Sequence, residues 1–279
     1  MMPTDRPQES VQLEAGRTAE PSPLQGPVPE PAAKLWTLRD LLLFVAFVPA
    51  ALLAANLLVA AGYSLLKPAM GWRLVPEQLA GSPFFLLTFQ AVFYGFVLGY
   101  MYLLVAIHHQ QPFWNALGWR RPTAAQTLGC VVGGLLLAIA IRFAPAVLPD
   151  AESFPLERLF SSAAAGYAIG GFAILVAPLM EELIFRGLLF AIFARLVGIR
   201  FAVLTTAVLF AGLHIPEYWG AWNHILLLFL VGMVFSLARG LTGSLAPSVF
   251  LHVGYNASMM AGLFFSTQHF RALQTLLAL

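Results

Sequence analysis

The sequence predicts an all-α, polytopic membrane protein: a bundle of about seven transmembrane helices, with an eighth, broken or re-entrant segment left open. Hydrophobic residues make up 59% of the 279 residues, and 10% are charged, against roughly 25% charged in a typical soluble domain. Apolar runs of about 20 residues recur, the length that crosses a hydrocarbon core of about 30 Å. The net charge of +2 comes from scattered Lys and Arg, so nothing indicates a nucleic-acid partner.

Residues 1–36 differ in composition from the rest of the chain. They are rich in proline and poor in large apolar side chains, and such a segment buries too little surface to offset the entropy of ordering. We therefore predict a disordered tail over residues 1–36 and a transmembrane helical domain over residues 37–279. The tail lacks the short apolar core and cleavage site of a signal peptide, so we expect no cleavage before the first span.

Seven apolar runs define the expected spans. Lys and Arg near their ends set the orientation: Arg120, Arg121, Arg195 and Arg239 fall in loops that we expect to be cytoplasmic, as is the N-terminus. His108 and His109 end the second run and are expected at the membrane interface. The expected spans are 41–64, 84–107, 126–148, 170–193, 200–217, 222–238 and 243–266.

The fourth span contains three charged residues, Glu181, Glu182 and Arg186. A charge near the centre of a bilayer costs from about 2.5 to more than 10 kcal/mol, so such groups need partners and usually mark a functional site. Glu182 and Arg186 are four residues apart on a helix and are expected to form an ion pair, whereas Glu181 points about 100° away. We predict a structural role for the pair and a role as general base for Glu181. Pro178 can loosen the helix just before them.

Three more polar residues lie within later spans. His214 follows Phe210 by four residues in the fifth span, and His252 and Asn256 share one face of the seventh. Taken singly, an intramembrane histidine more often bonds a neighbouring helix, and Phe210 is most simply a packing residue. Gathered with Glu181 in a hydrated cavity, however, the two histidines and the amide would suffice for a hydrolase that activates water.

The ordered set of motifs resembles the CPBP family of CAAX prenyl endoproteases and bacteriocin-processing or immunity (Abi) proteins. The motifs are Glu-Glu-x-x-x-Arg (Glu181, Glu182, Arg186), Phe-x-x-x-His (Phe210, His214) and His-x-x-x-Asn (His252, Asn256). The similarity covers about residues 166–260, which would be the protease core, and the turn at 117–122 is also similar to the family. The tail at residues 1–36 lies outside it.

The resemblance implies an intramembrane peptidase. By carry-over, Glu181 and His214 activate water, His252 and Asn256 stabilise the oxyanion or help to hold a metal, and Glu182 with Arg186 braces the site. The same chemistry leaves a second scheme open, in which Glu181, His214 and His252 bind Zn²⁺ or another divalent metal with water at the fourth position. A glutamate-dependent enzyme needs no metal.

The expected function is therefore an integral membrane endopeptidase acting at or within the bilayer of a bacterial plasma membrane. Its substrate would be a peptide or a membrane-anchored protein, lipidated or not, since fold and motifs do not settle the substrate. Two alternatives remain open: a transporter in which Glu181 and the histidines carry protons or a cation, and a non-catalytic immunity protein that binds a peptide.

Overall fold

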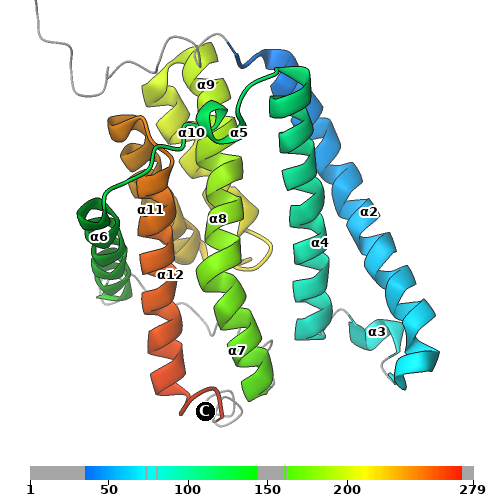
Figure 1. Ribbon diagram of the computed structural model, residues 1–279. Coiled ribbons are helices and arrows are strands. Elements are labelled where there is room, and N and C mark those ends of the chain that lie inside the picture. The colour runs from blue at the N-terminus through cyan, green and yellow to red at the C-terminus, as the bar shows by residue number, and fades with distance from the viewer. Residues whose placement is uncertain (1–34, 73–74, 80, 144–159, 161, 272–279) are drawn as a thin grey trace, which may run out of the picture.

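The computed structural model describes residues 35–72, 75–79, 81–143, 160 and 162–271, and every regular element in them is a helix (Figure 1). The predicted all-α class is confirmed. The predicted tail lies outside the described residues, apart from Leu35 and Trp36. In chain order the helices are α2 (Leu38–Met70), α3 (Pro76–Leu79), α4 (Pro83–Tyr102), η2 (Leu103–His108), α5 (Phe113–Ala116), α6 (Ala124–Phe143), α7 (Ala163–Gly171), η5 (Phe172–Val176), α8 (Ala177–Glu182), η6 (Leu183–Leu189), α9 (Phe190–Val197), α10 (Ile199–Leu213), α11 (Trp222–Thr242) and α12 (Ala246–Ser266).

Each of the seven predicted spans contains a helix, and five helical segments in the described residues are long and apolar enough to cross a membrane. They are 38–70, 83–108, 124–143, 163–197 and 222–242. α10 is shorter, and α12 has the length, but its His, Asn, Tyr and Ser side chains lower its hydropathy. The protein is thus a polytopic helical membrane protein, while crossing by α10 and α12 stays a prediction.

The fifth predicted span, 200–217, extends too far at its C-terminal end. α10 ends at Leu213, and residues 214–220 form turns. Pro216 explains the difference, because proline has no backbone N–H to donate and disfavours helical geometry in the residue before it. His214 and Glu217 therefore belong to a turn at the end of α10 rather than to a membrane-spanning helix.

The segment 163–197 is one continuous helical run that changes its geometry around Pro178. Two π-helical stretches, η5 and η6, flank the short α8, and each is closed by a bond from an N–H to the carbonyl five residues earlier: Ala177 to Phe172 and Phe190 to Phe185. π-Helical turns are rare and occur frequently at functional sites. The helix is therefore irregular near Pro178, as predicted. Its irregular part, α8 with η6, contains Glu181, Glu182 and Arg186.

α12 packs against α6 through glycines (Figure 1). A Cβ atom added to Gly254 would lie 2.1 Å from the carbonyl oxygen of Val131, and one added to Gly134 would lie 2.0 Å from that of Leu251. Neither position has room for a larger residue, and such small-residue contacts let membrane helices approach closely. This contact sets the position of α12, which carries His252 and Asn256.

α2 and α4 come together at one end of the molecule and separate towards the other, where α3 lies near both (Figure 1). α2 begins with a capping box in which Thr37 accepts a bond from the backbone N–H of Asp40, and the Asp40 carboxylate accepts one from that of Thr37. It ends at Gly71, whose φ of 64° is in the left-handed region that favours glycine.

Candidate functional site

A buried ion pair lies at the centre of the helical bundle. Arg186 donates from Nη1 to Oε1 of Glu182 at 2.8 Å, and both side chains are fully buried. The remaining guanidinium donors bond to α11, with Nη2 on the carbonyl oxygen of Gly232 at 2.8 Å and Nε on Oγ of Ser236 at 3.3 Å. The predicted pair is present, and it joins η6 to α8 and α11.

Aromatic rings enclose the same guanidinium. Its central carbon lies 4.8 Å from the ring centre of Phe210, 5.5 Å from that of Phe235 and 5.7 Å from that of Phe185. Contacts of this kind stabilise a desolvated cation. Phe210, predicted to be a packing residue, thus packs against the charged centre itself.

Glu181 occupies a different environment from its neighbour Glu182. Its side chain is 20% exposed, whereas that of Glu182 is fully buried. Tyr94 of α4 donates its hydroxyl to Oε1 of Glu181 at 3.2 Å, and Gln90 donates to that hydroxyl at 3.1 Å. The two adjacent carboxylates therefore diverge as predicted: one is fixed by the ion pair, and the other is accessible.

His252 of α12 lies between the two carboxylates. Its Nδ1 atom is 3.0 Å from Oε1 of Glu182, and its Nε2 atom is 3.8 Å from Oε2 of Glu181. The ring is buried and stacks on Phe235 with 4.7 Å between ring centres. Because a carboxylate only accepts, the shorter contact requires a proton on Nδ1. His252 and Glu181 are thus brought together from separate helices.

His214 lies at the end of α10, beside the same aromatic group. Its Nδ1 atom is 2.8 Å from the carbonyl oxygen of Phe210, which can only accept, so Nδ1 carries a proton and Nε2 is left as an acceptor. The ring centre of Phe210 lies 5.1 Å from that of His214 and 5.8 Å from that of His252. Phe210 therefore contacts both imidazoles.

Asn256 faces the 163–197 run, as His252 does. Its Nδ2 atom donates to the carbonyl oxygen of Ala173 in η5 at 2.7 Å. One amide hydrogen is thereby used and the second is left for another acceptor. The four-residue spacing of His252 and Asn256 thus places both side chains against the helix that carries Glu181, as predicted from the helical repeat.

Several residues of this region were missed in the sequence, among them Tyr94, Gln90, Ser236 and Glu217. Glu217 is the last residue of the predicted fifth span, and it keeps accessible surface in the turn after α10. Desolvation nonetheless raises the pKa of its carboxyl; His214 opposes that rise, and the negative charge of Glu181 adds to it. Glu217 is therefore a second carboxylate within electrostatic range of Glu181 and His214. The sequence does contain one signal for Glu217, because it is one of only three acidic residues after Arg158.

The predicted metal ligands do not meet at one point. In the described part of the chain, the side-chain group whose ligand atoms all lie within 4.8 Å of one another is Asp40, His108 and His109, not Glu181, His214 and His252. Three ligands that share one ion at about 2.1 Å must lie within about 4.2 Å of one another. The three predicted ligands therefore do not fit an ion in this arrangement, and we assign no step to one.

An apolar cavity lies between α2 and α4 at the end where they separate. Its volume is about 710 Å³, within the range of small-molecule sites. On α4 its lining ends at Val92, two residues before Tyr94. α4 therefore lines the cavity and also carries Tyr94, which bonds Glu181. The cavity is lined by Leu58, Val59, Gly62, Tyr63, Leu66, Trp72, Leu79, Ser82, Phe84, Phe85, Thr88 and Val92.

Fold and site together define an integral membrane protein whose helices enclose a polar centre. Residues 163–258 match the family described as type II CAAX prenyl endopeptidase Rce1-like. The match begins at the first residue of α7, ends within α12 and contains all three motifs, which confirms the resemblance to the CPBP family. No curated protein and no solved structure matches the chain. The family match supports a membrane endopeptidase of CAAX type.

Proposed function

We propose that the protein hydrolyses a peptide bond at or within the bilayer, with Glu181 as the general base. The observation that carries this proposal is the contrast between the two adjacent carboxylates. Glu182 is fully buried and neutralised by Arg186, whereas Glu181 is 20% exposed, bonded by one hydroxyl and 3.8 Å from His252. An accessible carboxylate held in a low-dielectric site is suited to accept a proton from water.

Water activation uses Glu181 with His214. Glu181 accepts a proton as the water oxygen forms a bond to the carbonyl carbon of the substrate, and it returns that proton to the amine as the C–N bond breaks. His214 orients the water through Nε2, which is an acceptor because Nδ1 donates to Phe210. Tyr94 holds the carboxylate in place through its hydroxyl.

Oxyanion stabilisation uses His252 and Asn256. The tetrahedral intermediate needs donors placed in advance where the charge develops. Asn256 has one amide hydrogen left after bonding Ala173. In its protonated form His252 donates from both nitrogens, so it can hold Glu182 with Nδ1 and offer Nε2 to the oxyanion. Glu182, Arg186 and Phe210 support these residues without touching the substrate.

The cavity between α2 and α4 supports a substrate that carries an apolar chain, such as a lipidated peptide. Its lining is mostly apolar. On α4 the lining extends to Val92, two residues before Tyr94, which bonds Glu181. Pockets of this kind gain affinity from burying apolar surface, while a few polar groups fix orientation. The chain would lie in the cavity while the peptide bond reaches Glu181.

The experiment that tests the function compares membranes from cells expressing wild-type and Glu181→Gln chains. We expect a new protein terminus that only the wild type produces. Equal sets of termini from two equally expressed, folded chains would contradict the proposal. Proton-dependent flux into liposomes that contain the wild-type protein, without hydrolysis of any peptide, would favour a transporter instead. Repeating the comparison with a chelator tests metal dependence.

Substrate class is tested separately at Gly62, which lines the cavity and has no atom within 4 Å of an added Cβ. We expect Gly62→Leu to narrow the cavity and to raise KM for a lipidated peptide. Gly99→Leu is the control, since Gly99 has the same open surroundings on α4 but does not line the cavity. Equal KM values for the two variants would exclude the cavity as the binding place of the apolar chain.

A further inference from the structure

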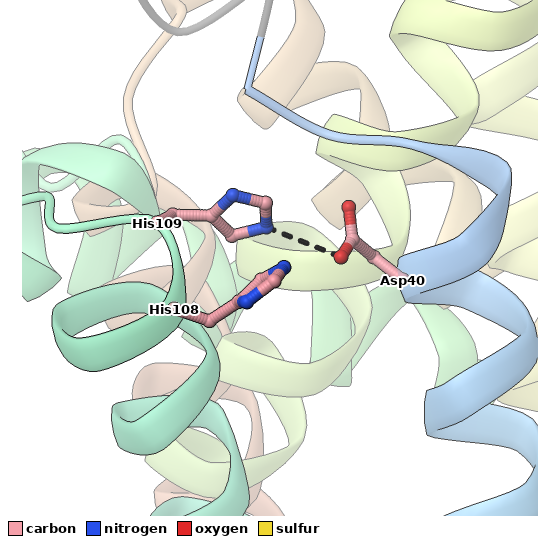
Figure 2. A group of neighbouring side chains, drawn as sticks. All are labelled: Asp40, His108 and His109. Carbon is pink, nitrogen blue, oxygen red and sulfur yellow. Dashed lines mark hydrogen bonds and ion pairs between the residues drawn. The ribbon is translucent and has the colours of Figure 1, made fainter.

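A second polar cluster lies where α2 meets the end of η2, the continuation of α4, far from Glu181. Asp40, in the first turn of α2, faces His108, the last residue of η2, and His109, which follows it (Figure 2). Oδ1 of Asp40 is 3.1 Å from Nε2 of His109, and the ligand atoms of all three residues lie within 4.8 Å of one another. Tyr94 and His108 are fourteen residues apart on one helical run, about 20 Å.

The Asp40 carboxylate is held in place by Thr37, the N-cap residue of α2, and its two oxygens have separate roles. Oδ2 accepts from the backbone N–H and from the hydroxyl of Thr37, both at 2.7 Å, as part of the capping box. Oδ1 is thereby directed towards the two imidazoles (Figure 2). The side chain of Asp40 is 1% exposed, and the ion-pair partner that the described residues give it is His109.

The backbone brings two adjacent histidines to the same side. Neighbouring residues of an α-helix point about 100° apart, but His108 ends the π-helix η2, and the N–H of His109 bonds the carbonyl oxygen of Leu104, five residues earlier. Gln110 then takes a φ of 53°, which is uncommon for a residue other than glycine and ends the helical run. Both rings face Asp40, with 4.8 Å between their centres.

Two imidazoles and one carboxylate form a donor set suited to borderline transition metals, Zn²⁺ above all. For tetrahedral Zn²⁺ with bonds of 2.0–2.1 Å, two ligand atoms lie about 3.3 Å apart, close to the 3.1 Å between Asp40 and His109. His108 is exposed, so its ring is free to move the small distance inward that a shared ion requires. The exposed side leaves a position for water.

We propose that Asp40, His108 and His109 form a transition-metal site, of the Zn²⁺ class, that fastens α2 to the end of η2, the continuation of α4. It lies at the end where these helices meet, while the apolar cavity opens at the end where they separate (Figure 1). A bound ion at the meeting point fixes the angle between the two helices and hence the width of the cavity. The site is independent of the peptidase centre.

The test is Zn²⁺ titration of the purified full-length protein in detergent after chelator treatment, followed by calorimetry and by the shift in Tm. We expect one equivalent bound and a higher Tm in the wild type. His108→Ala should weaken binding by about tenfold or more, because ligand losses in metal sites exceed the 10–100-fold effects of outer-shell changes. Because the His108 ring is exposed, its removal should leave the fold intact, so weaker binding would report the loss of a ligand. His109→Gln is the second variant.

Two controls separate this site from the peptidase centre. Glu181→Gln and His252→Ala should bind Zn²⁺ as the wild type does. Co²⁺ substitution gives a visible spectrum that His108→Ala should alter and Glu181→Gln should not. The proposal is overturned if the stripped wild type binds no Zn²⁺, if His108→Ala and His109→Gln bind it with unchanged affinity, or if binding is lost in Glu181→Gln instead.

Discussion

His252 donates from Nδ1 to Oε1 of Glu182 at 3.0 Å, and this contact joins α12 to α8 inside the bundle. The same oxygen accepts from Arg186, whereas Oε2 of Glu182 is buried without a hydrogen-bond partner among the described residues. One carboxylate oxygen therefore holds both an imidazole and a guanidinium. A change at Arg186 is therefore expected to disturb the carboxylate that holds His252.

Removing Arg186 should destabilise the protein strongly. Arg186→Met leaves the buried Glu182 carboxylate without its cation, and breaking a buried pair in this way costs about 3–5 kcal/mol. We expect a large drop in Tm in detergent and loss of activity. Arg200→Met is the matched control, because Arg200 is exposed and its loss should change Tm little. Equal Tm values for the two variants would show that the pair is not a structural clamp.

Tyr94→Phe should lower kcat while leaving the fold intact. It removes the hydroxyl that bonds Glu181 at 3.2 Å. The loss of one hydrogen bond to a charged group costs about 1.5–3 kcal/mol, which corresponds to roughly 10- to 150-fold in rate. Hydrolysis rates of purified variants measure this effect. Tyr100→Phe serves as the control on the same helix, since the described residues give the buried hydroxyl of Tyr100 no hydrogen-bond partner; comparable losses in both would remove Tyr94 from the site.

Gly254→Ala should both destabilise the protein and reduce activity. The added Cβ would lie 2.1 Å from the carbonyl oxygen of Val131, so α12 must move away from α6 and take His252 and Asn256 with it. Overpacking of this kind costs about 1–3 kcal/mol. Gly262→Ala, on the same helix with no atom within 4 Å of the added Cβ, should have little effect. A Gly254→Ala variant as stable and active as Gly262→Ala would contradict this packing.

Glu217 should make stability depend on pH. Desolvation raises the pKa of its carboxyl in the folded state above the unfolded value. The folded protein then binds this proton more tightly, so the associated stabilisation is present below the unfolded pKa and is lost as pH rises through the folded one. Glu217→Gln should match the wild-type Tm at low pH and exceed it above that window. A constant difference in Tm across the pH range would exclude this role.

Local periodicity explains which parts of the site could be predicted from the sequence. The Glu182–Arg186 pair and the shared direction of His252 and Asn256 follow from the four-residue repeat of a helix, which requires no knowledge of the fold. Apolar run length likewise placed each of the seven predicted spans on a helix among the described residues. The predicted fifth run ends too late, at residue 217, because Pro216 stops the helix and α10 ends at Leu213.

The remaining contacts depend on which helices are neighbours. Tyr94 reaches Glu181 across 87 residues of sequence, and Ser236 reaches Arg186 across 50. Nothing in an apolar run marks one tyrosine or serine as a partner of a distant charge. Asp40 and His109 are likewise 69 residues apart, and periodicity along either helix does not show that the start of α2 lies beside the two histidines.

The most direct measurement of the central claim is peptide hydrolysis by purified protein in liposomes, comparing wild type with Glu181→Gln. Glu181 is partly exposed and outside the buried ion pair, so glutamine should leave Tm nearly unchanged. With a lipidated peptide as substrate, we expect cleavage by the wild type and a loss of at least about a thousandfold in the variant, comparable to removing a key catalytic group. A folded Glu181→Gln protein that cleaves at the wild-type rate would contradict the assignment of Glu181 as the base.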